Sequence, residues 1–158
     1  MKSLPNRRRP AHQPVHETGN RAIIVFLTLC TKHRKPILAS PEAFHFVVSA
    51  WQEAKFWRVG RFVIMPDHVH LFCAPGVWPP HPLGDWIHFW RRAVARSWTR
   101  PAEKPIWQKD YWDHQLRSGD SYSEKWEYVR HNPVRHELVA SADQWPYQGE
   151  LETLRWHD

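Results

Sequence analysis

The sequence predicts an α+β domain in which two amphipathic helices cover one face of an antiparallel sheet. Three observations lead to this prediction: β-branched and aromatic runs of strand length, helical periodicity of apolar residues between them, and turn residues at the boundaries. In chain order the segments alternate as β-α-β-β-α-β-α. This is the order of a ferredoxin-like split βαβ sandwich, followed here by a third helix.

Four segments have the character of strands. Residues 22–31 are rich in Ile, Val, Phe and Leu and are too short for a confident helix, so we expect a buried central strand there. Residues 58–65 and 68–73 flank a Pro-Asp pair, which is turn chemistry, and are expected to form neighbouring strands of a hairpin. Residues 105–116 predict a short strand with irregular surroundings.

The three helices carry start and stop signals. Ser40 is a capping residue followed by Pro41, a residue favoured in the first helical turn. A second amphipathic stripe runs over residues 83–94. Ser121 opens a capping box before the third helix, which Pro133 must end.

Composition limits the classes of function. The 158 residues include 22 Lys and Arg against 16 Asp and Glu, a formal net charge of +6, which suits a polyanionic partner such as nucleic acid. The chain is 42% hydrophobic with 11 Trp and can bury a sizeable core. Its six glycines are too widely spaced for a Walker loop or a dinucleotide fingerprint. We therefore expect no nucleotide cofactor.

The chain divides into three parts by composition. Residues 1–20 are predicted to be a flexible basic arm, 21–149 the folded domain and 150–158 a tail. The longest apolar run, residues 22–30, is far shorter than the roughly 20 residues that span a bilayer, and no apolar segment of a leader follows the arginine-rich start. The two cysteines lie in apolar runs. We expect a soluble, cytoplasmic protein with reduced thiols and no membrane contact.

His68 and His70 form the first candidate site. On a strand, residues i and i+2 share a face, so the two imidazoles can share a metal ion, whereas Val69, Leu71 and Cys73 point to the other face. Taken alone, such a pair is more often solvated or hydrogen-bonded than bound to metal.

Tyr128 and Asn132 form the second candidate site. Tyr128 lies outside the apolar stripe of Tyr122, Trp126 and Val129, so its hydroxyl can face a groove. Asn132 follows four residues later, and a continuous helical turn would bring its amide beside that hydroxyl. The spacing alone favours the structural alternative, in which the asparagine caps a short helix opened by the next proline and the tyrosine is half-exposed packing.

Together, the two sets resemble the HUH-type tyrosine transposases, and more closely the REP-associated tyrosine transposase family. The matching segments, in family order, are Ile64–Phe72, Pro105–Gln108, Asp113–Arg117, Tyr128–Arg135, Leu138–Val139 and Trp145–Tyr147. The resemblance implies that His68 and His70 bind a divalent metal ion, with Asn132 as third ligand and Tyr128 as nucleophile. Mixed nitrogen and oxygen ligands suit Mg²⁺ or Mn²⁺ and also admit Zn²⁺, Ni²⁺ or Co²⁺. The resemblance also implies a homodimer.

The chemistry implied by these residue types needs no ATP. A tyrosine hydroxyl, with an ordinary pKa of about 10, is a poor nucleophile unless a metal ion makes the phosphodiester electrophilic. Attack on phosphorus would give a 5′-phosphotyrosine and a free 3′-hydroxyl. By resemblance, the substrate would be single-stranded DNA cleaved and rejoined at palindromic hairpins.

Basic residues are candidates for contacts with the DNA backbone. They are Arg7, Arg8, Arg9, Arg91, Arg92, Arg96, Arg100 and Lys109. Alternatively, these charged side chains only keep a helix surface and the N-terminal arm hydrated, without binding DNA.

Two other functions are open at this stage. One is a hairpin-binding module on the same fold that is non-catalytic or serves the host. The other is a metal phosphohydrolase that uses water in place of Tyr128. If Tyr128 is not the nucleophile, Tyr111 is the next tyrosine to test.

Overall fold

The structure is a computed structural model that describes residues 12, 15 and 22–158, so the predicted contacts of Arg7, Arg8 and Arg9 lie outside the described residues. Five strands form one antiparallel sheet in the order β4-β1-β3-β2-β5. The strands are β1 (Val25–Cys30), β2 (Trp57–Ile64), β3 (His68–Pro75), β4 (Trp112–Gln115) and β5 (Gln148–Glu150). The α-helices are α1 (Pro41–Glu53), α2 (Leu83–Ser97), α3 (Tyr122–Arg130) and α4 (Asn132–Arg135).

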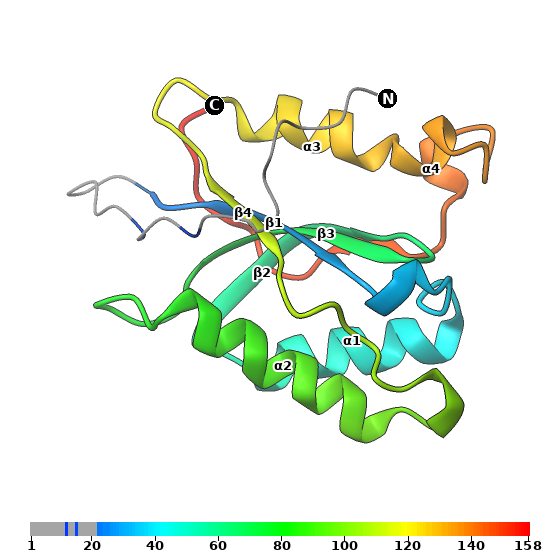
Figure 1. Cartoon of the computed structure of the whole chain (residues 1–158). Helices are drawn as coiled ribbons and strands as arrows, with labels where there is room; N and C mark the ends of the chain where they lie inside the picture. The colour runs from blue at the N-terminus through cyan, green and yellow to red at the C-terminus, as the bar shows by residue number, and fades with distance from the viewer. Residues whose placement is uncertain (1–11, 13–14, 16–21) are drawn as a thin grey trace, which may run out of the picture.

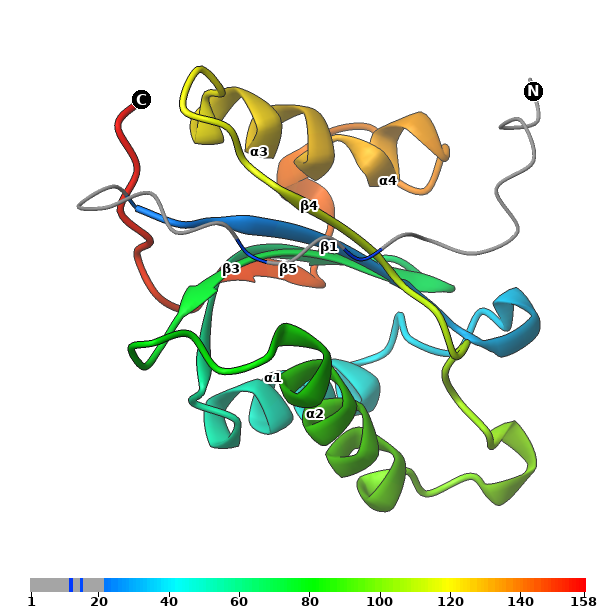
Figure 2. The same cartoon turned by 60° about the vertical axis from the view of Figure 1, so that its left-hand side comes forward.

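The predicted ferredoxin-like sandwich is confirmed. The first four strands have the order β4-β1-β3-β2 that a split βαβ unit requires, and α1 and α2 lie together on one face of the sheet (Figure 1). The third helix, α3, and the short α4 lie on the opposite face, as the rotated view also shows (Figure 2). The face that two helices alone would leave open is therefore covered by α3.

The helix boundaries follow the local signals. The Ser40 hydroxyl accepts a hydrogen bond from the Ala43 amide at 3.1 Å, and the Ser121 hydroxyl accepts one from the Glu124 amide at 3.2 Å. At its other end α3 stops at Arg130, and α4 begins at once with Asn132 and a proline in its first turn.

The sheet has a separate apolar core on each face. Toward α1 and α2, Val69 and Leu71 pack with Trp86 and other buried residues. Toward α3, Phe72 packs with Val129 and their neighbours. Successive residues of β3 thus enter opposite cores, as strand geometry requires. His68 and His70 consequently face the α3 side, as predicted.

The structure adds two features that the sequence did not predict. Strand β5 pairs with the edge of β2, and its three residues are too few to show periodicity. Residues 150–158, predicted to be a tail, lie against the domain: Leu154 is buried, and the Asp158 carboxylate accepts hydrogen bonds from the amides of Tyr122 at 2.5 Å and Ser123 at 2.9 Å. An acidic side chain at a helix N-terminus is favourable, which explains why the last residues pack there.

Both cysteines, Cys30 and Cys73, are free and buried. Burial raises the pKa of each thiol, so both favour the unreactive protonated form. Within residues 22–158, no helix is long and apolar enough to cross a membrane.

Truncation of Leu71 should show how much the core between the sheet and helices α1 and α2 contributes to stability. Leu71 is fully buried at the centre of the sheet, so Leu71→Ala is expected to lower the free energy of unfolding by about 3 kcal/mol. Urea unfolding followed by circular dichroism measures this change. Leu138→Ala is the matched control, because Leu138 is 44% exposed, and it should cost well under half as much. Equal losses in the two variants would contradict this description of the core.

Candidate active site

The two histidines of β3 point their ring nitrogens at each other. His68 Nε2 and His70 Nε2 are 3.1 Å apart. Two nitrogens bound to one metal ion at about 2.1 Å each can be at most about 4 Å apart, so the pair fits a shared ion. The other ring nitrogens are occupied: His68 Nδ1 bonds to Asp67 Oδ1 at 2.7 Å and His70 Nδ1 to Thr28 Oγ1 at 2.9 Å.

Arg34 holds one of these partners in place. Asp67 Oδ2 accepts a hydrogen bond from Arg34 Nε at 2.9 Å. Arg34 and its neighbour His33 have left-handed backbones, with φ of 53° and 57°, which costs of the order of 1 kcal/mol or more for each such residue. The arginine–carboxylate–imidazole chain is the arrangement that commonly orients a histidine ligand. The sequence marked Asp67 only as a turn residue and gave no sign of Thr28 or Arg34.

Burial keeps both imidazoles neutral. It lowers the pKa of His70 to about 3, and the electrostatic effects of His68 and Arg135 act in the same direction. Burial also lowers the pKa of His68, against the opposing effect of the Asp67 carboxylate. Neutral imidazole is the form that binds metal ions. The pair is thus in its ligand form at neutral pH.

Two imidazoles do not complete a metal site. Across residues 12, 15 and 22–158, no group of three His, Cys, Asp or Glu side chains could hold a metal ion. The third ligand that the family resemblance implies, Asn132, carries an amide and is buried. Its Oδ1 accepts a hydrogen bond from Arg135 Nη2 at 3.3 Å.

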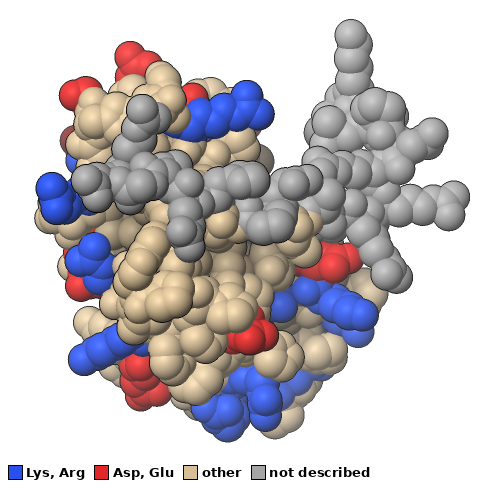
Figure 3. Space-filling view, turned by 90° about the vertical axis from the view of Figure 1, so that its left-hand side faces the viewer, with Lys and Arg blue, Asp and Glu red and all other residues tan. Residues whose placement is uncertain are grey.

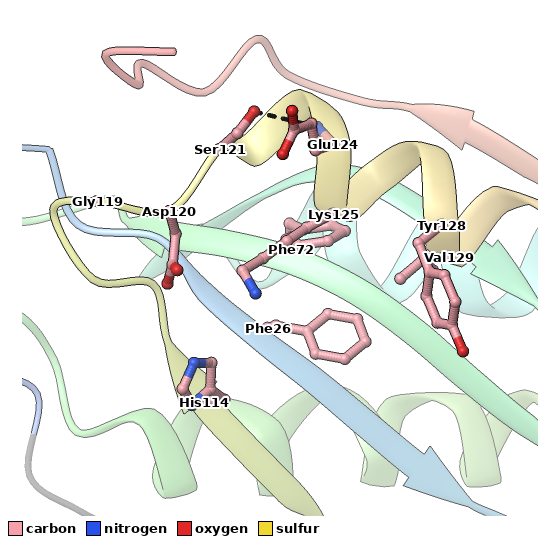
Figure 4. Close-up of a pocket in the computed structure, with 10 residues that line it drawn as sticks. All are labelled: Phe26, Phe72, His114, Gly119, Asp120, Ser121, Glu124, Lys125, Tyr128 and Val129. Carbon is pink, nitrogen blue, oxygen red and sulfur yellow. Dashed lines mark hydrogen bonds between the residues drawn. The ribbon is translucent and has the colours of Figure 1, made fainter.

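Tyr128 is open to the solvent. Its side chain is 69% exposed and projects from α3 toward the sheet (Figure 4). The sequence predicted that Tyr128 and Asn132 would be adjacent if one continuous helical turn joined them. Because α3 ends at Arg130, no such turn joins the two residues. The side chain of Arg135 contacts both instead.

Arg135 connects the two candidate sites. Its guanidinium carbon lies 4.0 Å from the centre of the Tyr128 ring, a cation–π contact, and its Nη2 reaches Asn132. Its charge is also among the causes that lower the pKa of His70. The sequence analysis placed Arg135 in the family motif but gave it no role. Its separation from Tyr128, seven residues or about two helical turns, is the one sequence feature that could have suggested the contact between their side chains.

The predicted DNA-binding residues of α2 lie apart from this site. Arg92 and Arg96 of α2 are exposed, but α2 covers the sheet face opposite to the histidines. Arg100 and Lys109, which follow α2 in the chain, are also exposed. Arg91 donates hydrogen bonds to the carbonyl oxygens of Gln108 at 2.8 Å and Lys109 at 3.3 Å, so it ties α2 to the following loop. In the face shown in Figure 3, Lys and Arg are scattered among acidic residues and form no single stripe. Their DNA contacts stay a prediction.

The lowered pKa of His70 predicts how stability depends on pH in metal-free protein. In the unfolded chain, His70 takes up a proton below the ordinary histidine pKa of about 6.5. In the folded protein, His70 stays neutral until the pH is near 3. The unfolding free energy should therefore fall with decreasing pH across this window, by up to about 1.4 kcal/mol per pH unit. Urea titrations from pH 7 to 4 measure it. His70→Gln should remove this part of the slope, and an unchanged slope would mean that His70 is not held neutral.

Some known proteins are similar to this chain in sequence, and some are similar to it in fold. No protein-family model matches it. The REP-associated tyrosine transposase of Escherichia coli (strain K12) is 25% identical over 126 residues, covering 77% of this chain and 73% of that protein. A Haemophilus influenzae protein provisionally assigned to the same class is 36% identical over 100 residues, covering 53% of each.

The structural similarity agrees with the sequence similarity. A solved structure of a REP-associated tyrosine transposase bound to a REP hairpin superposes with a TM-score of 0.61 at 20% identity, covering 87% of this chain and 82% of that one. The overall fold of this chain is thus similar to that of a solved transposase. In sequence and in fold, this chain is similar to REP-associated tyrosine transposases.

Proposed function

We propose that this chain is a metal-dependent DNA transposase that cleaves and rejoins single strands at palindromic hairpins through a phosphotyrosine at Tyr128. Its relationship to transposases supports a DNA-processing enzyme. The observation that carries the finer proposal is the side chain of Arg135, which contacts Tyr128 and Asn132 and acts electrostatically on His70. The relative solved with a REP hairpin supports hairpin DNA as the substrate.

His68, His70 and Asn132 would hold the divalent metal ion. The facing nitrogens of the two imidazoles support this assignment, and mixed nitrogen and oxygen ligands are compatible with Mg²⁺ or Mn²⁺. When bound, such an ion supplies Lewis acidity at a non-bridging phosphate oxygen. Thr28 and Asp67 hold the rings in the orientation that leaves both Nε2 atoms available.

Tyr128 supplies the nucleophile. Its hydroxyl oxygen forms a bond to phosphorus, the bond from phosphorus to the 3′ oxygen breaks, and the proton lost by tyrosine ends on the released 3′-hydroxyl. Arg135, above the ring, favours negative charge developing on the phenol oxygen. The exchange conserves one phosphoester bond, so rejoining needs only the reverse attack by a 3′-hydroxyl.

The homodimer implied by the family resemblance stays a prediction. Size-exclusion chromatography with light scattering distinguishes one copy from two.

Removal of the nucleophile should abolish the covalent intermediate. In Tyr128→Phe, the band of protein covalently joined to labelled hairpin DNA should disappear from a denaturing gel in the presence of Mn²⁺, while hairpin binding changes by less than about threefold, since the exposed hydroxyl contributes little to the fold. Tyr111→Phe is the matched control and should keep the adduct. Adducts that persist in Tyr128→Phe but vanish in Tyr111→Phe would assign the nucleophile to Tyr111.

The same assay separates the alternatives. Cleavage that survives Tyr128→Phe indicates a phosphohydrolase that uses water. Hairpin binding by the wild-type protein with neither cleavage nor adduct, at any divalent metal, indicates the non-catalytic module.

Loss of a ligand should weaken metal binding itself. Electron paramagnetic resonance of free Mn²⁺ should show that His70→Ala binds the ion at least about 100-fold more weakly than the wild type, and Thr28→Val about 10- to 100-fold more weakly, because Thr28 orients the ligand. His45→Ala, an exposed histidine of α1, should bind Mn²⁺ normally. Unchanged affinity in His70→Ala would exclude the histidine pair as the metal site.

A further inference from the structure

We propose that the pocket between α3 and the sheet binds one unpaired nucleobase of the DNA strand, next to the phosphate that Tyr128 attacks. This inference rests on the proposed function and adds a recognition site to it. The pocket has a volume of about 430 Å³, which lies within the range typical of small-molecule sites. It can hold a base together with its sugar.

The floor of the pocket is aromatic. Phe26 of β1 and Phe72 of β3 line it from the sheet, with ring centres 4.9 Å apart, and Tyr128 lines it from α3 (Figure 4). Phe26 is only half-buried, so its ring is accessible from the pocket. Aromatic rings accept any base by stacking, since every base has a π-face.

The walls carry polar groups of both kinds. Lys125 extends from α3 toward the sheet above Phe26, and His114 lies below on β4 (Figure 4). Neither side chain has a hydrogen-bond partner within the part of the chain that the structure describes. Asp120 adds a carboxylate, which accepts one hydrogen bond from the Arg117 amide at 2.7 Å. The edges of nucleobases offer donors and acceptors together, and these groups can pair with both.

The charge of the pocket favours a base over a phosphate. Two carboxylates, those of Asp120 and Glu124, line it beside a single lysine. A phosphate group would be repelled by the two carboxylates, whereas a neutral base would not be.

The pocket also has the right position. Lys125 and Tyr128 are three residues apart on α3 and lie on one side of the helix. Phe26 lines the pocket and also stacks on His70, with ring centres 5.4 Å apart and planes at 21°. A base held here is therefore separated from the candidate metal ligands by one side chain, as expected for the nucleotide beside the cleaved phosphate.

A scan with abasic nucleotides tests this inference through binding alone. Fluorescence anisotropy in EDTA would compare hairpin oligonucleotides with single-stranded flanks, each lacking the base at one flank position. Removal of the base at one or two positions should weaken wild-type binding about tenfold. The same removal should weaken Lys125→Gln and His114→Ala less than about twofold, because their pocket contacts are already reduced.

Lys55→Gln is the matched control, since it removes an equal charge at an exposed site at the end of α1 and should keep the full abasic effect. Thermal melts confirm that each variant is folded. The inference is wrong if every abasic position weakens all the proteins equally. It is also wrong if Lys125→Gln lowers only the salt dependence of binding, which would indicate a phosphate contact.

Failure of this inference is distinguishable from failure of the proposed function. Adducts at Tyr128 without any position-specific abasic effect would leave the transposase and remove the pocket. A position-specific abasic effect that depends on Lys125, without adducts in Mn²⁺, would leave a base-binding module and remove the enzyme.

Discussion

The alternation of side chains along β3 is the constraint on which the rest of the structure depends. The strand lies between β1 and β2, and each of its side chains points to one of the two sheet faces, each of which carries an apolar core. Val69 and Leu71 fill the core under α1 and α2, so His68 and His70 must share the other face. A shift of one residue in register would exchange the two sets and bury both imidazoles among apolar side chains. The strength of the first core therefore fixes the position of the site.

The break between α3 and α4 has a comparable effect on the other half of the site. Pro133 ends the regular helix, and the chain turns at His131 before α4 begins. The turn brings Arg135 back over Tyr128 and against Asn132. In a continuous helix the spacing alone would relate the tyrosine to the amide, whereas here one arginine side chain contacts both.

The two faces of the sheet have different tasks in the proposed function. The α3 face holds the histidine pair, the tyrosine and the aromatic pocket, which together suit an unpaired strand. The exposed basic residues of α2 lie on the other face.

The sequence by itself determined the ferredoxin-like order of elements, the caps of α1 and α3, and the shared face of His68 and His70, because these follow from local periodicity and turn chemistry. It also brought Tyr128 and Asn132 to attention through the family motif. Only the tertiary structure decided that Thr28 and Asp67 orient the imidazoles, that Arg135 joins the halves, and that the last residues pack on α3. These contacts join residues far apart in sequence or across a helix break, and no local pattern encodes them, since they depend on how separate elements meet around the two cores.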